Sequence, residues 1–266
     1  MPTITVNGEA LHYQFHHGAP RAGSAPLVLL HGAGGNLMHW PGELRRLPGH
    51  AVFALDLPGH GKSDGRGRGE IGAYAEVVRG FTEALRPEGM PPCVLIGHSM
   101  GGAIALEFAL RYRARLAGLI LVGTGARLRV APQILTGILN DFRGTTALLA
   151  QWAHGEYVDP NLLRLYTRRL REVSPEIIHD DFAACVAFDR RADVSRITAP
   201  TLILCGDADR MTPVKFSQYL HEQVAGSQLV VVPGAGHMVM LEQPAAVSEA
   251  VAYFLTSLAK ASGNNG

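Results

Sequence analysis

A serine flanked by glycines is the first feature of this sequence that could do chemistry. It lies in Gly97-His-Ser99-Met-Gly101, between an apolar run and a stretch with helical periodicity. In a sharp turn from strand to helix, glycines let the two elements approach without a Cβ clash, and the central residue stands exposed at the end of the strand. A helix-capping serine in a glycine-rich turn is the alternative interpretation. We favour a nucleophile at Ser99.

Serine is a weak nucleophile at neutral pH, so it requires a base and a group that orients the base. His237 follows two glycines in the loop after the last apolar run, which would hold its imidazole over the strand ends near Ser99. The preceding run is followed by two carboxylates, Asp207 and Asp209. Asp209 is the better candidate because a turn three residues past the run can aim it at His237, whereas Asp207 is placed to cap that turn. The chain order serine, aspartate, histidine is that of one class of catalytic triads.

A glycine-rich loop after the first parallel run is suited to bind a negatively charged oxygen. Its small side chains, in His31-Gly-Ala33-Gly34-Gly-Asn36, let backbone N–H groups line a cavity. We predict an oxyanion hole formed by the N–H groups of Met100 and Ala33, with Gly34 as the next candidate. A phosphate-binding loop is the competing interpretation, and it fails because no Gly-Lys-Ser/Thr follows.

Short apolar runs without alternation predict the strands that position these residues, at 27–31, 51–56, 93–97, 119–123, 201–206 and 228–233. Such strands are buried on both faces, as in a parallel sheet. Helix-period stretches fall between them, at 71–85, 100–112, 214–224 and 244–258, and a hairpin around Asn7-Gly8 opens the chain. We therefore predict an α/β fold with a mostly parallel, eight-stranded sheet and helices on both faces.

The interval between residues 125 and 199 contains no strand-like run. Four helical stretches lie there instead, at 132–142, 145–154, 160–173 and 175–188, each beginning near a proline or threonine. We expect a four-helix cap, residues 127–193, inserted into a core domain made of residues 1–126 and 194–266. It should cover the strand ends, where such sheets bind ligands. We expect Phe142, Trp152 and Met238 to line the substrate pocket.

The charge balance and the cysteine content indicate which kinds of ligand and site this protein can have. The 266 residues carry 24 Lys and Arg against 23 Asp and Glu, a formal net charge of +1. No basic field is therefore available to hold nucleic acid or an anionic membrane, and we expect a small, largely uncharged substrate. Three cysteines without a Cys-x-x-Cys pair indicate neither a disulfide framework nor a zinc site. With no signal-peptide pattern and no apolar run near the ~20 residues of a membrane span, we expect a cytoplasmic protein that requires no metal or cofactor.

Five motifs occur in a characteristic order: His31-Gly-Ala-Gly34, Asp56-Leu-Pro-Gly-His-Gly-Lys-Ser63, Gly97-His-Ser-Met-Gly-Gly102, Gly206-Asp-Ala-Asp209 and Gly234-Ala-Gly-His237. With them the chain resembles the α/β-hydrolase superfamily along nearly its whole length, and within it the small microbial carboxylesterases, lactonases and carbon–carbon bond hydrolases. The resemblance implies that Asp56 and Ser63 support a loop near the strand ends. Serine at position 99 argues against the haloalkane dehalogenases and epoxide hydrolases of this shape, which normally carry aspartate there.

The residues and the resemblance together predict a serine hydrolase acting on carboxylic esters. Ser99 attacks the ester carbonyl, His237 takes its proton, Asp209 stabilises the imidazolium, and water then releases the acid from an acyl-enzyme. Two alternatives stay open. A carbon–carbon bond hydrolase or lactonase would use the same triad, and the former requires a cap arginine such as Arg191 to reach a substrate carboxylate. A ligand-binding receptor would keep the triad with little turnover.

Overall fold

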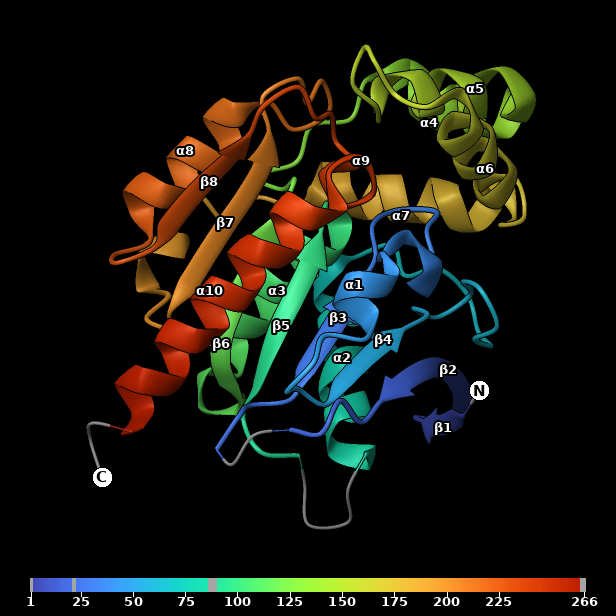
Figure 1. Ribbon diagram of the computed structural model, residues 1–266. Helices are drawn as coiled ribbons and strands as arrows, with labels where there is room; N and C mark the ends of the chain where they lie inside the picture. The colour runs from blue at the N-terminus through green and yellow to red at the C-terminus, as the bar shows by residue number, and fades with distance from the viewer. Residues whose placement is uncertain (1, 21–22, 86–89, 264–266) are drawn as a thin grey trace.

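The computed structural model describes residues 2–20, 23–85 and 90–263, which are built around one sheet (Figure 1). Its eight strands follow the order β1-β2-β4-β3-β5-β6-β7-β8. β2 pairs antiparallel with β1 and β4, and the neighbours from β4 to β8 run parallel. The strands are β1 Thr3–Val6, β2 Glu9–His16, β3 Leu27–Leu30, β4 Val52–Leu55, β5 Cys93–His98, β6 Leu116–Val122, β7 Thr201–Gly206 and β8 Gln228–Val232. The predicted fold class is therefore confirmed.

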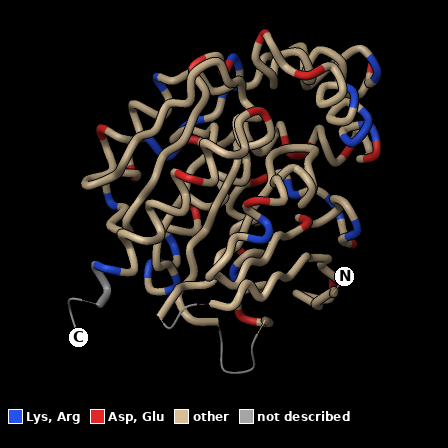
Figure 2. Tube along the Cα trace, viewed as in Figure 1, with Lys and Arg blue, Asp and Glu red and all other residues tan. Residues whose placement is uncertain are grey.

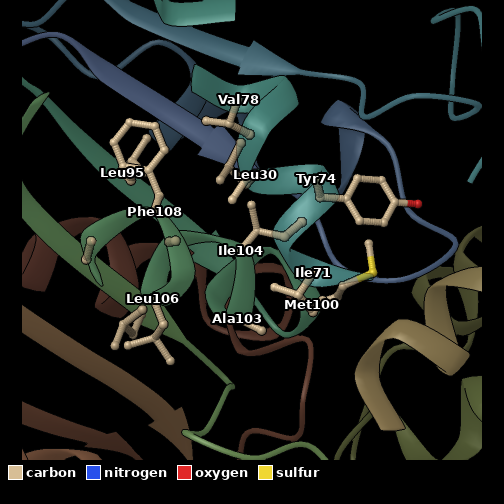
Figure 3. Close-up of a cluster of buried hydrophobic side chains, with 14 of the residues drawn as sticks. Leu30, Ile71, Tyr74, Val78, Leu95, Met100, Ala103, Ile104, Leu106 and Phe108 are labelled. Carbon is tan, nitrogen blue, oxygen red and sulfur yellow. The ribbon is translucent and has the colours of Figure 1, made fainter. Parts of the chain in front are cut away.

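Both faces of the sheet are covered, as runs of consecutive apolar residues require. Along β3, Leu27 and Leu29 belong to one buried cluster and Val28 and Leu30 to the other. Outside the segment between β6 and β7, the helices are α1 Gly42–Arg45, α2 Ile71–Ala84, α3 Met100–Arg111, α8 Val214–Gln223, α9 Val239–Glu242 and α10 Pro244–Gly263. Residues of α2, α3 and α8 pack in the cluster that contains Leu30, and residues of α1 and α10 in the other. Figure 3 shows part of the cluster that contains Leu30, where Leu30 and Leu95 pack against side chains of α2 and α3.

Four helices lie between β6 and β7, and we call them the insertion: α4 Pro132–Asn140, α5 Phe142–Trp152, α6 Pro160–Leu170 and α7 Pro175–Ala187. They lie over the end of the sheet at which the parallel strands finish (Figure 1). The helices themselves were predicted, but the boundary between the first two was misplaced. Asp141 ends α4 and caps α5, because its side chain accepts a hydrogen bond from the N–H of Gly144 at 3.0 Å, so α5 begins three residues earlier than predicted.

Two turns have the backbone geometry that their residues predict. In the N-terminal hairpin, Asn7 and Gly8 have φ values of 51° and 86°, as a type I′ turn requires. Between β5 and α3, a Cβ on Gly97 would lie 2.2 Å from the carbonyl oxygen of Gly101. One on Gly101 would lie 2.3 Å from the carbonyl oxygen of Leu30. Side chains larger than hydrogen are therefore excluded at both positions.

Within the described ranges, no helix has the length and apolar character needed to cross a membrane.

Replacing Gly97 with alanine tests the close approach of β5 and α3. The added methyl group meets a backbone oxygen that cannot move aside, so we expect Gly97→Ala to lower the free energy of unfolding by about 3 kcal/mol. Gly69→Ala is the matched control, because a Cβ there meets no atom within 4 Å. Urea unfolding of both variants measures the difference. Equal stabilities would contradict the proposed packing of the turn.

Candidate active site

Ser99 stands at the sharp turn between β5 and α3 in a strained backbone conformation, with φ 53° and ψ −117°. A non-glycine residue rarely adopts such angles, and surrounding contacts must hold it there. Its N–H donates to the carbonyl oxygen of Val122 at 2.9 Å, and its own carbonyl accepts from the Thr124 hydroxyl at 2.8 Å. Both contacts pin the turn to the end of β6, while the serine itself is half-buried.

His237 and Asp209 form a buried pair at the ends of β8 and β7. His237 Nδ1 donates to Asp209 Oδ2 at 2.8 Å. The other carboxylate oxygen accepts the N–H groups of Met211 and Thr212, both at 2.8 Å. Burial alone would raise the pKa of Asp209, but the nearby His237 and the hydrogen bonds from Thr212 hold it below its ordinary value. The carboxylate therefore stays charged opposite the imidazole.

Thr212 is a member of this group that sequence reasoning missed. Its hydroxyl donates to Asp209 Oδ2 at 2.8 Å and lies 3.2 Å from His237 Nδ1. The signal was present in the spacing, because a threonine three residues after an aspartate is placed to close a turn onto that carboxylate. Asp207, the other candidate carboxylate, is exposed and accepts the N–H of Gly234 at 2.7 Å. It braces the loop that leads to His237 and does not contact the imidazole.

His98 connects His237 to the turn that carries Ser99. Its Nε2 donates to the carbonyl oxygen of His237 at 3.0 Å, and the two rings lie 4.7 Å apart between centroids. Burial, and then the neighbouring His237, keep the pKa of His98 well below its ordinary value, so this ring is neutral. A hydrogen bond between Ser99 Oγ and His237 Nε2 is not among the contacts of the described residues. Such bonds are often long in unliganded enzymes and shorten when substrate binds.

Two backbone N–H groups near Ser99 are available to a negatively charged oxygen. Met100 is the first residue of α3, where the helix dipole is positive, and Ala33 lies in the loop after β3. In the described part of the chain, neither N–H takes part in a backbone hydrogen bond outside regular helices and strands. The loop lies against the turn, since a Cβ on Gly32 would come within 3.1 Å of Ser99 Cβ.

The prediction for Gly34 requires a correction. Its N–H donates to Asp181 Oδ2 at 2.8 Å and is therefore not available to an oxyanion. Ala33 and Met100 remain as the two candidate donors.

Asp181, in α7, connects the insertion to three segments of the core. It is fully buried and accepts hydrogen bonds from Gly34, from the hydroxyl of Tyr74 and from His60 Nε2, the last at 2.8 Å. His60 Nδ1 faces the carbonyl oxygen of Pro58 at 2.9 Å, so both ring nitrogens face acceptors and the ring is an imidazolium. Burial opposes this charge, yet the Asp181 carboxylate raises the pKa of His60 above its ordinary value.

Sequence reasoning missed Asp181, although helical spacing places it beside Ile178 and Cys185 on the buried face of α7. An acidic residue on an apolar face requires partners. The sequence does not indicate which ones, because they come from residues 34, 60 and 74.

The loop that carries His237 is also attached to the insertion. Glu242 accepts the N–H of Gly236 at 3.1 Å and that of Gly155, which follows α5, at 2.9 Å. The N–H of Met238 donates to the carbonyl oxygen of Ala153 at 2.9 Å. The position of the imidazole thus depends on the end of α5.

Asp56 and Ser63 lie where the motif predicts, beside the glycine-rich loop. Asp56 accepts the N–H of Leu37 at 2.7 Å and the Nδ1 of His12 at 2.7 Å. Ser63 Oγ donates to the carbonyl oxygen of Asp56 at 2.6 Å. These contacts tie the start of the loop after β4 to the segment that follows Gly34.

A cavity of about 730 Å³ lies between the insertion, the segment leading into α4 and the loop after β7. Trp152, one of the three side chains expected to line a pocket, is part of its wall. Phe142 and Met238 are not. Phe142 packs against the buried cluster that contains Leu27, and Met238 is 1% exposed within that cluster. Ser99 and His237 are also absent from the lining, whereas Arg210 and Met211, which directly follow Asp209 in the chain, belong to it.

Comparison with known proteins assigns the chain to a family. A sequence profile of the alpha/beta hydrolase family matches residues 27–250. The chain belongs to the α/β-hydrolase family. The sheet order, the turn at Ser99 and the paired Asp209 and His237 are thus features of an α/β hydrolase.

Several relatives of this α/β hydrolase have names that describe the cleavage of esters or lactones. A pimeloyl-[acyl-carrier protein] methyl ester esterase of Pectobacterium carotovorum is 30% identical over 249 residues, which cover 88% of this chain and 95% of the relative. The solved structure of a thermophilic esterase is 30% identical, with a TM-score of 0.83 and 97% of both chains covered. An enol-lactonase from Burkholderia xenovorans is 25% identical, with a TM-score of 0.86, and 96% of this chain and all of that chain are covered.

Removing the charge of Asp181 tests how strongly the insertion of this α/β hydrolase is held to the core. We expect Asp181→Asn to lower the free energy of unfolding by about 3 kcal/mol near pH 6, because it leaves the His60 imidazolium without its counter-charge. A histidine whose pKa is raised by folding stabilises the protein fully below its unfolded pKa and loses that contribution as pH rises through its folded pKa. The difference from wild type should therefore shrink at alkaline pH, as measured by urea unfolding across a pH series.

Asp180→Asn is the matched control, because this neighbouring side chain is 45% exposed and pairs loosely with His179. An equal loss of stability in both variants, or a loss for Asp181→Asn that does not vary with pH, would show that the buried ion pair is not what holds the insertion.

Proposed function

We propose that this α/β hydrolase is a serine hydrolase that cleaves carboxylic esters of small to medium size through an acyl-enzyme. The observation that carries the proposal is the buried 2.8 Å contact of His237 with Asp209, held by His98 against the strained turn at Ser99. A base oriented by a carboxylate beside an exposed hydroxyl is the arrangement that activates serine. The methyl ester esterase and the thermophilic esterase among its relatives support the same chemistry.

Each group has one role in the proposed mechanism. Ser99 Oγ adds to the ester carbonyl carbon while its proton passes to His237 Nε2, and the carbonyl oxygen becomes an oxyanion held by the N–H groups of Ala33 and Met100. Asp209 stabilises the imidazolium through Nδ1. The C–O bond to the alcohol then breaks, and the alcohol leaves with the proton from His237. Water, deprotonated by the same imidazole, attacks the acyl-enzyme and releases the acid.

The insertion acts as a cap in this proposal, with residues 127–193 forming the lid of a core made of residues 1–126 and 194–266. Support comes from its position over the strand ends and from its contacts with both catalytic loops (Figure 1). Excluding water from the site strengthens the electrostatic interactions on which the oxyanion depends.

A lactonase or a carbon–carbon bond hydrolase is the second candidate, since both would use the same residues. Arg191 lines the cavity beside the insertion, where it can meet a substrate carboxylate, and the enol-lactonase neighbour supports ring opening by an ester-type attack. A panel that sets p-nitrophenyl esters against lactones and a vinylogous diketone discriminates the candidates by their relative kcat/KM.

Replacing Ser99 with alanine tests the nucleophile. We expect Ser99→Ala to lower kcat for p-nitrophenyl esters, from acetate to octanoate, by about 100,000-fold, because no other group can form the acyl-enzyme. Release of p-nitrophenol measures the rate, and a fluorophosphonate probe should label wild type but not the variant. Equal rates in the two proteins would exclude Ser99 as the nucleophile. Binding of esters with negligible turnover by wild type would favour a receptor.

A pair of matched substitutions tests which carboxylate orients the base. Asp209→Asn should reduce kcat about 10,000-fold, because the amide cannot stabilise the imidazolium or hold its tautomer. Asp207→Asn, two residues away and bonded only to the loop, should stay within about twofold of wild type. Steady-state kinetics with one ester suffices. A larger effect at Asp207 than at Asp209 would reverse the assignment.

A further inference from the structure

The cavity beside the insertion has an apolar interior that the mechanism above does not use. Its wall contains apolar side chains from the insertion, from α8, from the segment that leads into α4 and from the loop after β7: Val130, Ile134, Leu149, Trp152, Phe182, Met211, Phe216 and Tyr219. A volume of about 730 Å³ is in the range that holds a small organic ligand. These apolar side chains by themselves could bind any apolar group and do not distinguish one ligand from another.

The same wall carries five cationic side chains: Arg127, Arg129, Arg191, Arg210 and Lys215. No aspartate or glutamate is among the described residues that line it. This clustering of positive charge is not expected from the composition, because the chain as a whole has a formal net charge of only +1. Over the rest of the molecule, positions of both signs are interspersed (Figure 2).

Two of the five cations share one acidic neighbour, and the other three have none among the described residues. Asp189 lies 2.7 Å from Arg191 and 3.8 Å from Arg127, and hydrogen bonds from Arg191 lower the pKa of Asp189 to about 2. Within the ranges that the structure describes, no ion pair involves Arg129, Arg210 or Lys215, and all three are exposed. The positive charge of the rim is therefore available to a ligand.

The cavity adjoins both halves of the candidate active site. Arg210 and Met211 directly follow Asp209, and Ala126 lies two residues after Thr124, whose hydroxyl binds the carbonyl oxygen of Ser99. The cavity wall thus continues into the segment that carries Asp209 and into the segment that holds the Ser99 turn.

We propose that this cavity binds the anionic end of an elongated substrate, a carboxylate joined to an apolar or aromatic body, while the scissile ester lies at Ser99. The part of this proposal that makes the ligand a substrate rests on the proposed ester hydrolysis. The binding of a carboxylate in the cavity is independent of that hydrolysis. Cations beside a low-dielectric wall attract an anion more strongly than cations in open water, and the guanidinium fork matches a carboxylate. A substrate of this kind carries a charge, unlike the largely uncharged substrate expected from the net charge of the chain.

Binding of 6-phenylhexanoate, compared with that of 6-phenylhexan-1-ol, tests the proposal without any turnover. Trp152 reports from the cavity wall, and the second tryptophan, Trp40, is fully buried. We expect saturable quenching of tryptophan fluorescence by the carboxylate, with a Kd about fivefold lower than that of the alcohol at low ionic strength. Trp152→Phe should abolish the signal.

Charge-neutralising variants locate the binding. In Arg129→Gln/Lys215→Gln, which leaves Arg210 in place, the preference for the carboxylate should fall to about twofold, while binding of the alcohol stays unchanged. Lys260→Gln, which removes an exposed lysine on α10, is the matched control and should bind like wild type. Equal affinity of wild type for the two ligands, no saturable signal, or a preference that the double substitution leaves undiminished would each overturn the proposal.

A kinetic comparison separates this proposal from the proposed function. The mono-p-nitrophenyl ester of adipic acid and p-nitrophenyl hexanoate share a six-carbon acyl chain and differ in the terminal carboxylate. Wild type should prefer the adipate ester by about fivefold in kcat/KM, and the double variant by about twofold. Carboxylate binding without hydrolysis of either ester would refute the esterase while retaining the site. Hydrolysis of both esters at equal kcat/KM would retain the esterase and refute the site as a substrate site.

Discussion

The close contact of backbone with backbone at the start of α3 is the constraint on which the rest of the site depends. Gly97 and Gly101 allow the helix to begin against β5 and over the carbonyl oxygen of Leu30, so that β3, β5 and α3 meet at one point. The chain can then reverse only by placing Ser99 at a positive φ. The hydroxyl, the Met100 N–H and the loop after β3 all take their positions from that turn, and a single added methyl group would displace them together.

Much of this arrangement could be predicted because its determinants are local. Apolar runs of five or six residues predicted the parallel strands, and glycines at the strand ends marked the turns. The positions of Asp209 and His237 followed from the strands before them. The helices of the insertion were also predicted from their periodicity, apart from the boundary at Asp141, where one side chain both ends a helix and caps the next.

What the sequence did not reveal depends on contacts between distant segments. Asp181 is 147 residues from Gly34 and 107 from Tyr74, and no periodicity in the chain relates them. The hydrogen bond from the Gly34 N–H to Asp181 is also the reason that Gly34 cannot serve in the predicted oxyanion hole. Net charge has a related blind spot. It averages over the whole surface and does not show that cationic side chains gather where α8 faces the insertion.

The attachment of Glu242 to both Gly155 and Gly236 has a mechanical consequence. The end of α5 and the loop before His237 share one carboxylate, and the Met238 N–H adds a second tie to Ala153. An outward rotation of α5 must therefore either break these ties or carry the imidazole away from Ser99. In the proposed mechanism, alignment of the base therefore depends on where the end of α5 lies.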